Sequence, residues 1–138
     1  MRNITHIVVH CTATSQSATV SSIQRYWRTI MKWRQPGYHI IVTPGGAAIR
    51  LAEDSKTTNG VKGHNLTSLH ISYIGGIAED GKPLDNRTPA QKETLLLMIK
   101  DWLQRYPDAV VCGHRDFPGV NKACPSFDAL AEYNHLTC

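Results

Sequence analysis

The chain is organised around residues Cys112 to Asp128, which read C-G-H-R-D-F-P-G-V-N-K-A-C-P-S-F-D. An apolar run of β-strand type, Ala109 to Val111, precedes this stretch. The pair Pro125–Ser126 near its end predicts the start of a helix. The stretch is therefore a loop between two regular elements, where functional groups are often presented. It carries His114 and Cys124, and histidine with cysteine is the ligand chemistry that Zn²⁺ prefers.

The composition indicates one globular domain spanning residues 1–138. A chain of this length can bury a single sizeable core, and 41% hydrophobic with 19% charged residues excludes a disordered or fibrous protein. No run approaches 18 uninterrupted apolar residues, so a transmembrane helix is not expected. The first ten residues lack the apolar core and cleavage site of a signal peptide. We therefore expect a protein that acts in the cytoplasm or is delivered by another component.

The charge is mildly basic, with a net charge of +4 and a pI near 9.0. That balance suits an anionic partner such as nucleic acid or bacterial cell wall, although a soluble surface with no such partner explains it equally well. Lysine and arginine are scattered, without the cluster that marks a nucleic-acid footprint, so no nucleic acid is expected. Two disulfides are not expected either, in the absence of a secretion signal, from the four cysteines Cys11, Cys112, Cys124 and Cys138.

The first strand is predicted from Ile4 to Cys11, a stretch rich in β-branched residues. Alternation places its even-numbered residues, His10 among them, on one face and its odd-numbered residues on the other. A helix follows, because four apolar residues recur at helical spacing, and we expect it to end near Trp33. The four residues of this predicted stripe are Val20, Ile23, Trp27 and Ile30.

The rest of the chain continues the alternation of strands and helices. Residues 38–51 predict a β-hairpin, residues 53–68 a long polar loop, and residues 69–74 another strand. Thr88, Pro89 and Gln91 form a capping box at the start of a helix, whose apolar stripe is Leu95, Met98 or Ile99, Trp102 and Tyr106. A strand at 109–112 and a short helix at 126–133 complete the order. We predict an α/β fold, with a mixed central sheet flanked by helices.

His10 lies at the end of the first predicted strand, and His114 lies just beyond the last. If those strands are neighbours, both imidazoles converge with Cys124, and three protein ligands leave a tetrahedral Zn²⁺ one open position. A single histidine on a strand is more often structural than a ligand. Cys112 is a rival ligand, although its apolar surroundings favour burial as a small hydrophobic residue. Spacing alone leaves the ligand set open.

Five motifs carry a resemblance to a known family. They are V-V-H-C-T-A-T (8–14), P-G-Y-H-I-I-V (36–42), S-L-H-I-S-Y-I-G-G (68–76), R-T-P-A-Q (87–91) and K-A-C-P-S-F-D (122–128). In this order they resemble the type 2 N-acetylmuramoyl-L-alanine amidases, a superfamily that includes small phage lysozymes and peptidoglycan recognition proteins. The resemblance spans nearly the whole chain, and five ordered motifs are far more specific than any one of them.

The resemblance implies a zinc amidase that cleaves the bond between N-acetylmuramic acid and L-alanine in peptidoglycan. It implies one Zn²⁺ per chain, held by His10, His114 and Cys124, and two catalytic residues, Tyr38 and Lys122. In such a site zinc activates a water molecule, and the Lys122 ammonium helps to stabilise the oxyanion. The hydroxyl of Tyr38 either acts as a base or orients the water.

The chain departs from the family pattern at three positions. Several relatives carry a histidine in the loop where this chain has Gly60, and here His64 follows four residues later. We predict that His64 contacts substrate, with an exposed loop histidine as the alternative. His70 replaces a glycine of the relatives, and either fills a structural role or narrows the substrate groove.

The expected partner is peptidoglycan or a muropeptide, with no membrane association, and we expect a monomer. Family habit suggests an endolysin that waits in the cytoplasm until it is released to the cell wall. One alternative is a peptidoglycan-binding module of the same fold without activity, although such modules typically lack the ligand cysteine. Another is a cytoplasmic amidase that recycles soluble muropeptides. Some phage amidases of this kind also bind an RNA polymerase, a role that the sequence does not test.

Overall fold

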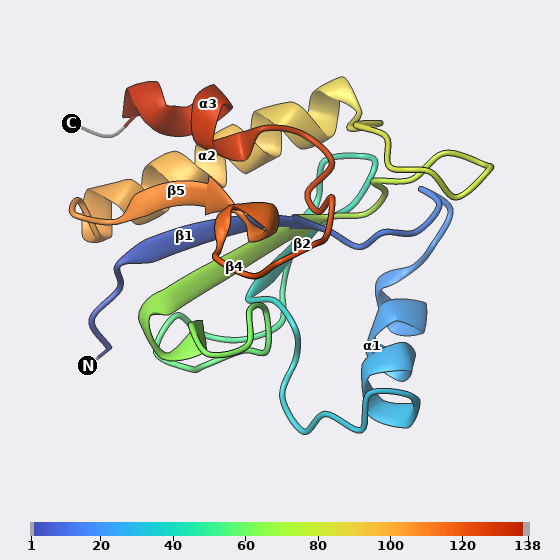
Figure 1. Cartoon of the computed structure of the whole chain (residues 1–138), viewed down its shortest axis with the longest axis horizontal. Helices are drawn as coiled ribbons and strands as arrows, with labels where there is room; N and C mark the ends of the chain where they lie inside the picture. The colour runs from blue at the N-terminus through green and yellow to red at the C-terminus, as the bar shows by residue number, and fades with distance from the viewer. Residues whose placement is uncertain (1, 137–138) are drawn as a thin grey trace.

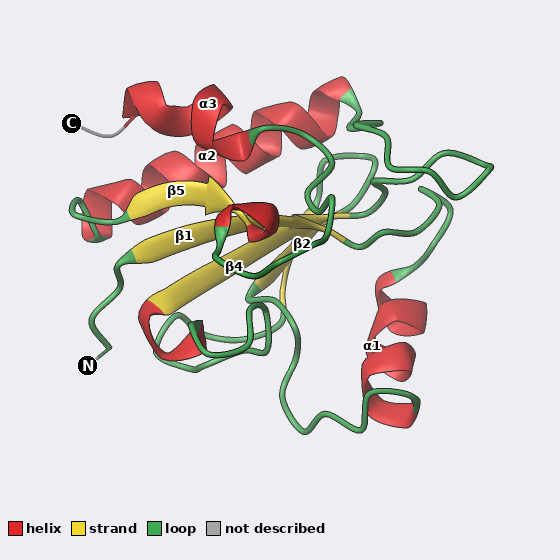
Figure 2. Cartoon of the chain, in the orientation of Figure 1, coloured by secondary structure: helices red, strands yellow, loops and turns green. Residues whose placement is uncertain are grey.

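The computed structural model describes residues 2–136, which are built around one five-stranded sheet (Figures 1 and 2). The strand order is β3-β2-β4-β1-β5, and β3 alone pairs antiparallel with its neighbour. Helices flank this mixed sheet, which confirms the predicted α/β class. The strands are β1 (His6–Cys11), β2 (Ile40–Val42), β3 (Ala48–Arg50), β4 (Ser68–Tyr73) and β5 (Val110–Gly113). The helices are α1 (Val20–Thr29), α2 (Pro89–Arg105) and α3 (Ala129–Tyr133).

One face of the sheet is covered by α2 and α3 (Figure 1). The predicted capping box begins α2, because Thr88 Oγ1 accepts from the Gln91 amide and Gln91 Oε1 accepts from the Thr88 amide, both at 3.0 Å. The helix then buries Leu95, Ile99 and Trp102. These side chains share one apolar cluster with the odd-numbered residues of β1, so this face holds the main core. We call it the core face.

The opposite face of the sheet is covered by α1 and by loops, and we call it the site face. Ile23 and Trp27 of α1 pack against residues that include Ile41 of β2. The predicted apolar stripe of α1 is partly wrong, because Ile30 is 64% exposed. The helix also ends at Thr29 rather than near Trp33, so Ile30 lies at the C-cap, after the last helical residue.

The last helix begins later than predicted. Ser126 has a φ of 70°, which is outside the helical region, and it follows a cis peptide bond at Pro125. The helix α3 starts at Ala129, where Asp128 accepts a hydrogen bond from the Ala131 amide at 3.1 Å and acts as the N-cap. The Ser126 hydroxyl instead donates to the Gly76 carbonyl at 2.8 Å, which ties the loop to the end of β4.

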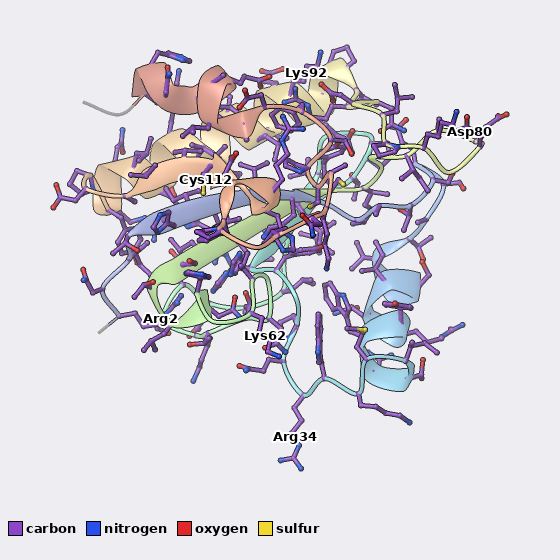
Figure 3. All side chains as sticks on the ribbon, in the orientation of Figure 1. Arg2, Arg34, Lys62, Asp80, Lys92 and Cys112 are labelled. Carbon is purple, nitrogen blue, oxygen red and sulfur yellow. The ribbon has the colours of Figure 1, made fainter. Side chains whose placement is uncertain are left out.

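The long loop between β3 and β4 is held in place by Arg2, which is labelled in Figure 3. Its guanidinium donates to the carbonyls of Asn65 at 3.1 Å and Ser68 at 3.0 Å, and also to the carbonyl of Asp54. Charged, partly buried hydrogen bonds of this kind anchor a loop that has little regular structure. No helix within residues 2–136 is long and apolar enough to cross a membrane.

Candidate metal centre

Three predicted ligands converge on the site face. His10 is the fifth residue of β1, His114 directly follows β5, and Cys124 lies in the loop before α3. Their ligand atoms all lie within 4.8 Å of one another. The rings of His10 and His114 have centroids 4.9 Å apart, and His10 Nδ1 lies 3.8 Å from Cys124 Sγ. Residues far apart in the sequence therefore present two nitrogens and one sulfur to a common point.

Sheet pairing explains why the two histidines meet. Strands β1 and β5 are parallel neighbours, and their register pairs Val9 with Gly113, one residue before each histidine. Backbone hydrogen bonds then bring in the cysteine. The Arg115 amide donates to the Cys124 carbonyl at 2.9 Å, and the Cys11 amide donates to Cys124 Sγ at 3.3 Å.

The protonation states of the two histidines suit a metal ligand. Burial, followed by the charge of Lys122, lowers the pKa of His114 to about 4. Burial, followed by the charges of His70 and His114, lowers the pKa of His10 well below its ordinary value. Both imidazoles are therefore neutral near pH 7, and a neutral imidazole has a lone pair for a metal.

Cys124 needs a cation to become a thiolate. A hydrogen bond with the Cys11 side chain, followed by burial, raises the pKa of the Cys124 thiol well above its ordinary value. Cys124 is a free cysteine, so no disulfide removes its sulfur. Nitrogen and sulfur ligands on tetrahedral Zn²⁺ lie about 3.3–3.6 Å apart at the usual bond lengths. The three side chains therefore fit one ion with small side-chain movements.

Tyr38 lies directly beside the candidate ligands. Its ring centroid is 4.9 Å from that of His10, and its other neighbour is the Trp27 ring at 5.4 Å. The hydroxyl donates to the Cys11 carbonyl at 3.3 Å. Burial raises the pKa of Tyr38, so its hydroxyl keeps the proton and is suited to donating hydrogen bonds. This favours the orienting role over the base.

Lys122 is exposed at the rim of a cavity of about 200 Å³ that contains the three candidate ligands and Tyr38. A second cavity, of about 650 Å³, shares five lining residues with it: Trp33, Asn59, Gly60, His114 and Lys122. Together they form an open groove that leads to the ligands. A cavity of about 750 Å³ around residues 77–86 contains none of the predicted site residues, so we assign it no part in the chemistry.

The remaining predictions have different outcomes. His64 lies outside the groove, where it contacts the Phe117 ring at 4.6 Å and lines a separate cavity with His6. Its predicted contact with substrate stays a prediction. Cys112, labelled on β5 in Figure 3, is buried against Val8 and Phe117, in agreement with a packing role. Cys138 lies outside the described residues.

The sequence does not predict the place of two tryptophans in the groove, or the buried contact of His70 with His10. The sequence predicts Trp27 as part of the apolar stripe of a helix and Trp33 as the end of that helix, yet both line the cavity around the candidate ligands. The sequence leaves the role of His70 open between structure and groove, and in the structure its imidazole lies against His10, with Nδ1 2.9 Å from His10 Nε2. The available signal was that Gly60 and His70 both depart from the family pattern, which points to a paired change.

Fold and site together define an α/β protein with three candidate metal ligands gathered at the end of its central strands. Comparison with known proteins then identifies the family. Residues 1–127 match the family described as N-acetylmuramoyl-L-alanine amidase. The endolysin of Klebsiella phage KP32 is 36% identical over 123 residues, which cover 88% of this chain and 80% of that protein. The chain therefore belongs to the type 2 N-acetylmuramoyl-L-alanine amidases, as its motifs indicated.

Solved structures agree on the fold. The Ph2119 endolysin from a Thermus scotoductus bacteriophage superposes with a TM-score of 0.82 at 22% identity, covering 99% of this chain and 86% of that one. The Drosophila peptidoglycan recognition protein PGRP-SA superposes with a TM-score of 0.77 at 14% identity, covering 97% of this chain and 79% of that one. At these identities the two structures support the architecture alone.

Proposed function

We propose that this amidase holds one Zn²⁺ between His10, His114 and Cys124 and hydrolyses the amide between N-acetylmuramic acid and L-alanine. The observation that carries the proposal is the convergence of three ligand atoms within 4.8 Å at the end of an open groove. Zinc bound there would supply Lewis acidity, since such a metal lowers the pKa of water from 15.7 to about 7 and polarises a carbonyl oxygen. Residues 1–138 would act as one catalytic domain.

The protein's own residues supply the rest of the chemistry. Lys122 lies at the cavity rim, where its ammonium stabilises negative charge that develops on the carbonyl oxygen during hydrolysis. Tyr38, with its proton retained, orients the reacting groups by donating a hydrogen bond. The aromatic rings of Trp27 and Trp33 line the cavity around the candidate ligands.

The substrate we propose is peptidoglycan, and the biological role is lysis of the cell wall by an endolysin-like protein. Lys62 and Lys122 give the groove a basic character, which suits the carboxylates of a peptide stem. A binding module without activity is less well supported, because Cys124 is present and its sulfur faces His10 Nδ1. Intact sacculi compared with soluble muropeptides, as parallel substrates, would separate lysis from recycling.

The decisive experiment measures metal content and peptide release for the wild type, Cys124→Ala and Cys112→Ala. We expect one zinc per wild-type chain, and in Cys124→Ala a loss of bound zinc with a fall in release on the order of 10³-fold. Cys112→Ala is the matched control, because Cys112 packs against Val8 and Phe117 away from the ligands. A Cys124→Ala protein that keeps both zinc and activity would contradict the proposal.

A further inference from the structure

A line of hydrogen bonds runs from Asn65, in the loop before β4, through buried His70 to the candidate ligand His10. Asn65 Oδ1 lies 2.9 Å from His70 Nε2, and His70 Nδ1 lies 2.9 Å from His10 Nε2. His10 Nδ1, on the other side of that ring, faces Cys124 Sγ at 3.8 Å. Each ring nitrogen of His10 therefore has its own partner. Nε2 faces His70, and Nδ1 faces the candidate ligand Cys124.

The direction of these hydrogen bonds follows from a backbone amide. The Val61 N–H, which can only donate, points to Asn65 Oδ1 at 2.7 Å and so fixes that atom as the acceptor. His70 must then carry its proton on Nε2 to donate to the same oxygen. Its Nδ1 is left with a lone pair, which accepts the proton on His10 Nε2. His10 is thereby held in the tautomer whose Nδ1 lone pair faces Cys124 and His114.

Packing keeps the His70 ring in this position. His70 is fully buried, and its backbone amide donates to His39 Nδ1 at 3.1 Å. On another side the loop approaches so closely that a Cβ on Gly60 would lie 2.3 Å from His70 Nδ1. No side chain fits at position 60 while the imidazole occupies this space, so the glycine and the histidine are a matched pair.

We infer that His70 is a positioning residue for the metal ligand His10, oriented in turn by Asn65. The inference rests on the proposed zinc site. When the second ring nitrogen of a ligand histidine donates its N–H to an acceptor, that hydrogen bond fixes the tautomer and ring orientation of the ligand and raises its basicity. Here the acceptor is His70 Nδ1, which receives the hydrogen bond from His10 Nε2. None of the family motifs assigns this role to His70.

The first test measures zinc affinity by competition with a chelator. His70→Leu fills similar space without an acceptor, and we expect its affinity to fall about 10- to 100-fold. His70→Asn places an oxygen near the position of Nδ1 and should recover most of that loss. His6→Leu is the matched control, because His6 lies on the same face of β1 and bonds Thr5 rather than His10. Equal losses in His70→Leu and His70→Asn would overturn the inference in favour of simple packing.

The second test uses the metal-free protein and nitrogen NMR of the His10 ring, which reports the tautomer directly. We expect the Nε2–H form in the wild type and a mixture of tautomers in His70→Leu. If His70→Leu fails to fold, Asn65→Leu takes its place in this test, because position 65 is partly exposed. We expect Asn65→Leu to shift the His70 tautomer. An Nδ1–H form of His10 in the wild type would overturn the inference. A wild type that binds no zinc would instead refute the proposed site, so the two failures are distinguishable.

Discussion

The two faces of the central sheet are built from the same strands and do different things. On the core face, alternate residues of β1 and β4 pack with α2 in one apolar cluster. On the site face, the neighbouring residues His10, His70 and Ser72 are at most 1% exposed, and they are polar. Apolar burial stabilises the fold without partners of fixed geometry, whereas each buried imidazole needs hydrogen bonds that offset its desolvation. Along one strand, therefore, residues that stabilise the fold alternate with residues that form the candidate site.

If the two faces are separate, a change on the site face should lower the rate of hydrolysis without lowering stability. Lys122 provides the largest expected effect of this kind. We expect Lys122→Met to lower the hydrolysis rate by ~10²–10³, because an oxyanion loses one stabilising donor. The free energy of unfolding should change by no more than about 0.5 kcal/mol, since Lys122 is exposed. Lys100→Met, on the exposed side of α2, is the control for charge alone. A rate loss as large in Lys100→Met would remove the special role of Lys122.

The converse change removes volume from the core face. Leu95 is fully buried under the sheet, so Leu95→Ala should lower the free energy of unfolding by about 2–5 kcal/mol in denaturant titrations. Zinc affinity of the folded protein should stay at the wild-type value. Leu97 is 54% exposed on the same helix, and Leu97→Ala should cost no more than about 0.5 kcal/mol. A weaker zinc affinity in Leu95→Ala would show that the two faces are coupled.

A third change tests how tightly the site face is packed. Gly60→Ala places a methyl group against the His70 ring, and we expect a loss of about 1–3 kcal/mol in unfolding free energy. The loss should shrink when His70→Ala is added, because the methyl group then has space. Gly45 has no atom within 4 Å of its potential Cβ, so Gly45→Ala should be neutral or slightly stabilising. Additive effects of Gly60→Ala and His70→Ala would refute the matched pair.

The smallest expected effect concerns acid stability at the edge of the core face. Arg87 forms ion pairs with Asp85 at 2.9 Å and Glu132 at 2.8 Å. Burial favours a higher pKa for Asp85, but hydrogen bonds from Arg87 outweigh it and lower the pKa; the Arg87 hydrogen bond also lowers the pKa of Glu132. Lowered pKa values mean that this stabilisation is present above about pH 4 and is lost as the pH falls further.

The contribution should be about 1 kcal/mol or less, because both carboxylates are partly exposed and water screens the pairs. Unfolding measured between about pH 5 and pH 3 should therefore be less acid-sensitive in Arg87→Met than in the wild type. Arg28→Met, on the exposed side of α1, should follow the wild-type curve. A curve for Arg87→Met as steep as that of the wild type would contradict the assignment.

Local signals predicted much of the fold. The alternation in β1 correctly predicted that His10 and Val9 lie on opposite faces of the sheet. The capping box correctly predicted Thr88 as the N-cap of α2. The prediction failed where tertiary contacts decide the backbone. Ile30 continues the helical spacing but is mostly exposed, and Ser126 has a φ of 70° while its hydroxyl donates to the Gly76 carbonyl. Periodicity indicates which secondary structure a segment can form by itself, whereas tertiary packing decides which one it adopts.

By itself the sequence determined the class of fold and, through the family motifs, the three candidate ligands, with Tyr38 and Lys122 beside them. Only the tertiary structure decided that β1 and β5 are neighbours in a register that sets His10 against His114. It also decided that His70 faces His10 and that Gly60 leaves it room. The physical reason is that hydrogen bonds and close contacts between residues 10 to 114 positions apart depend on distances that no local pattern encodes.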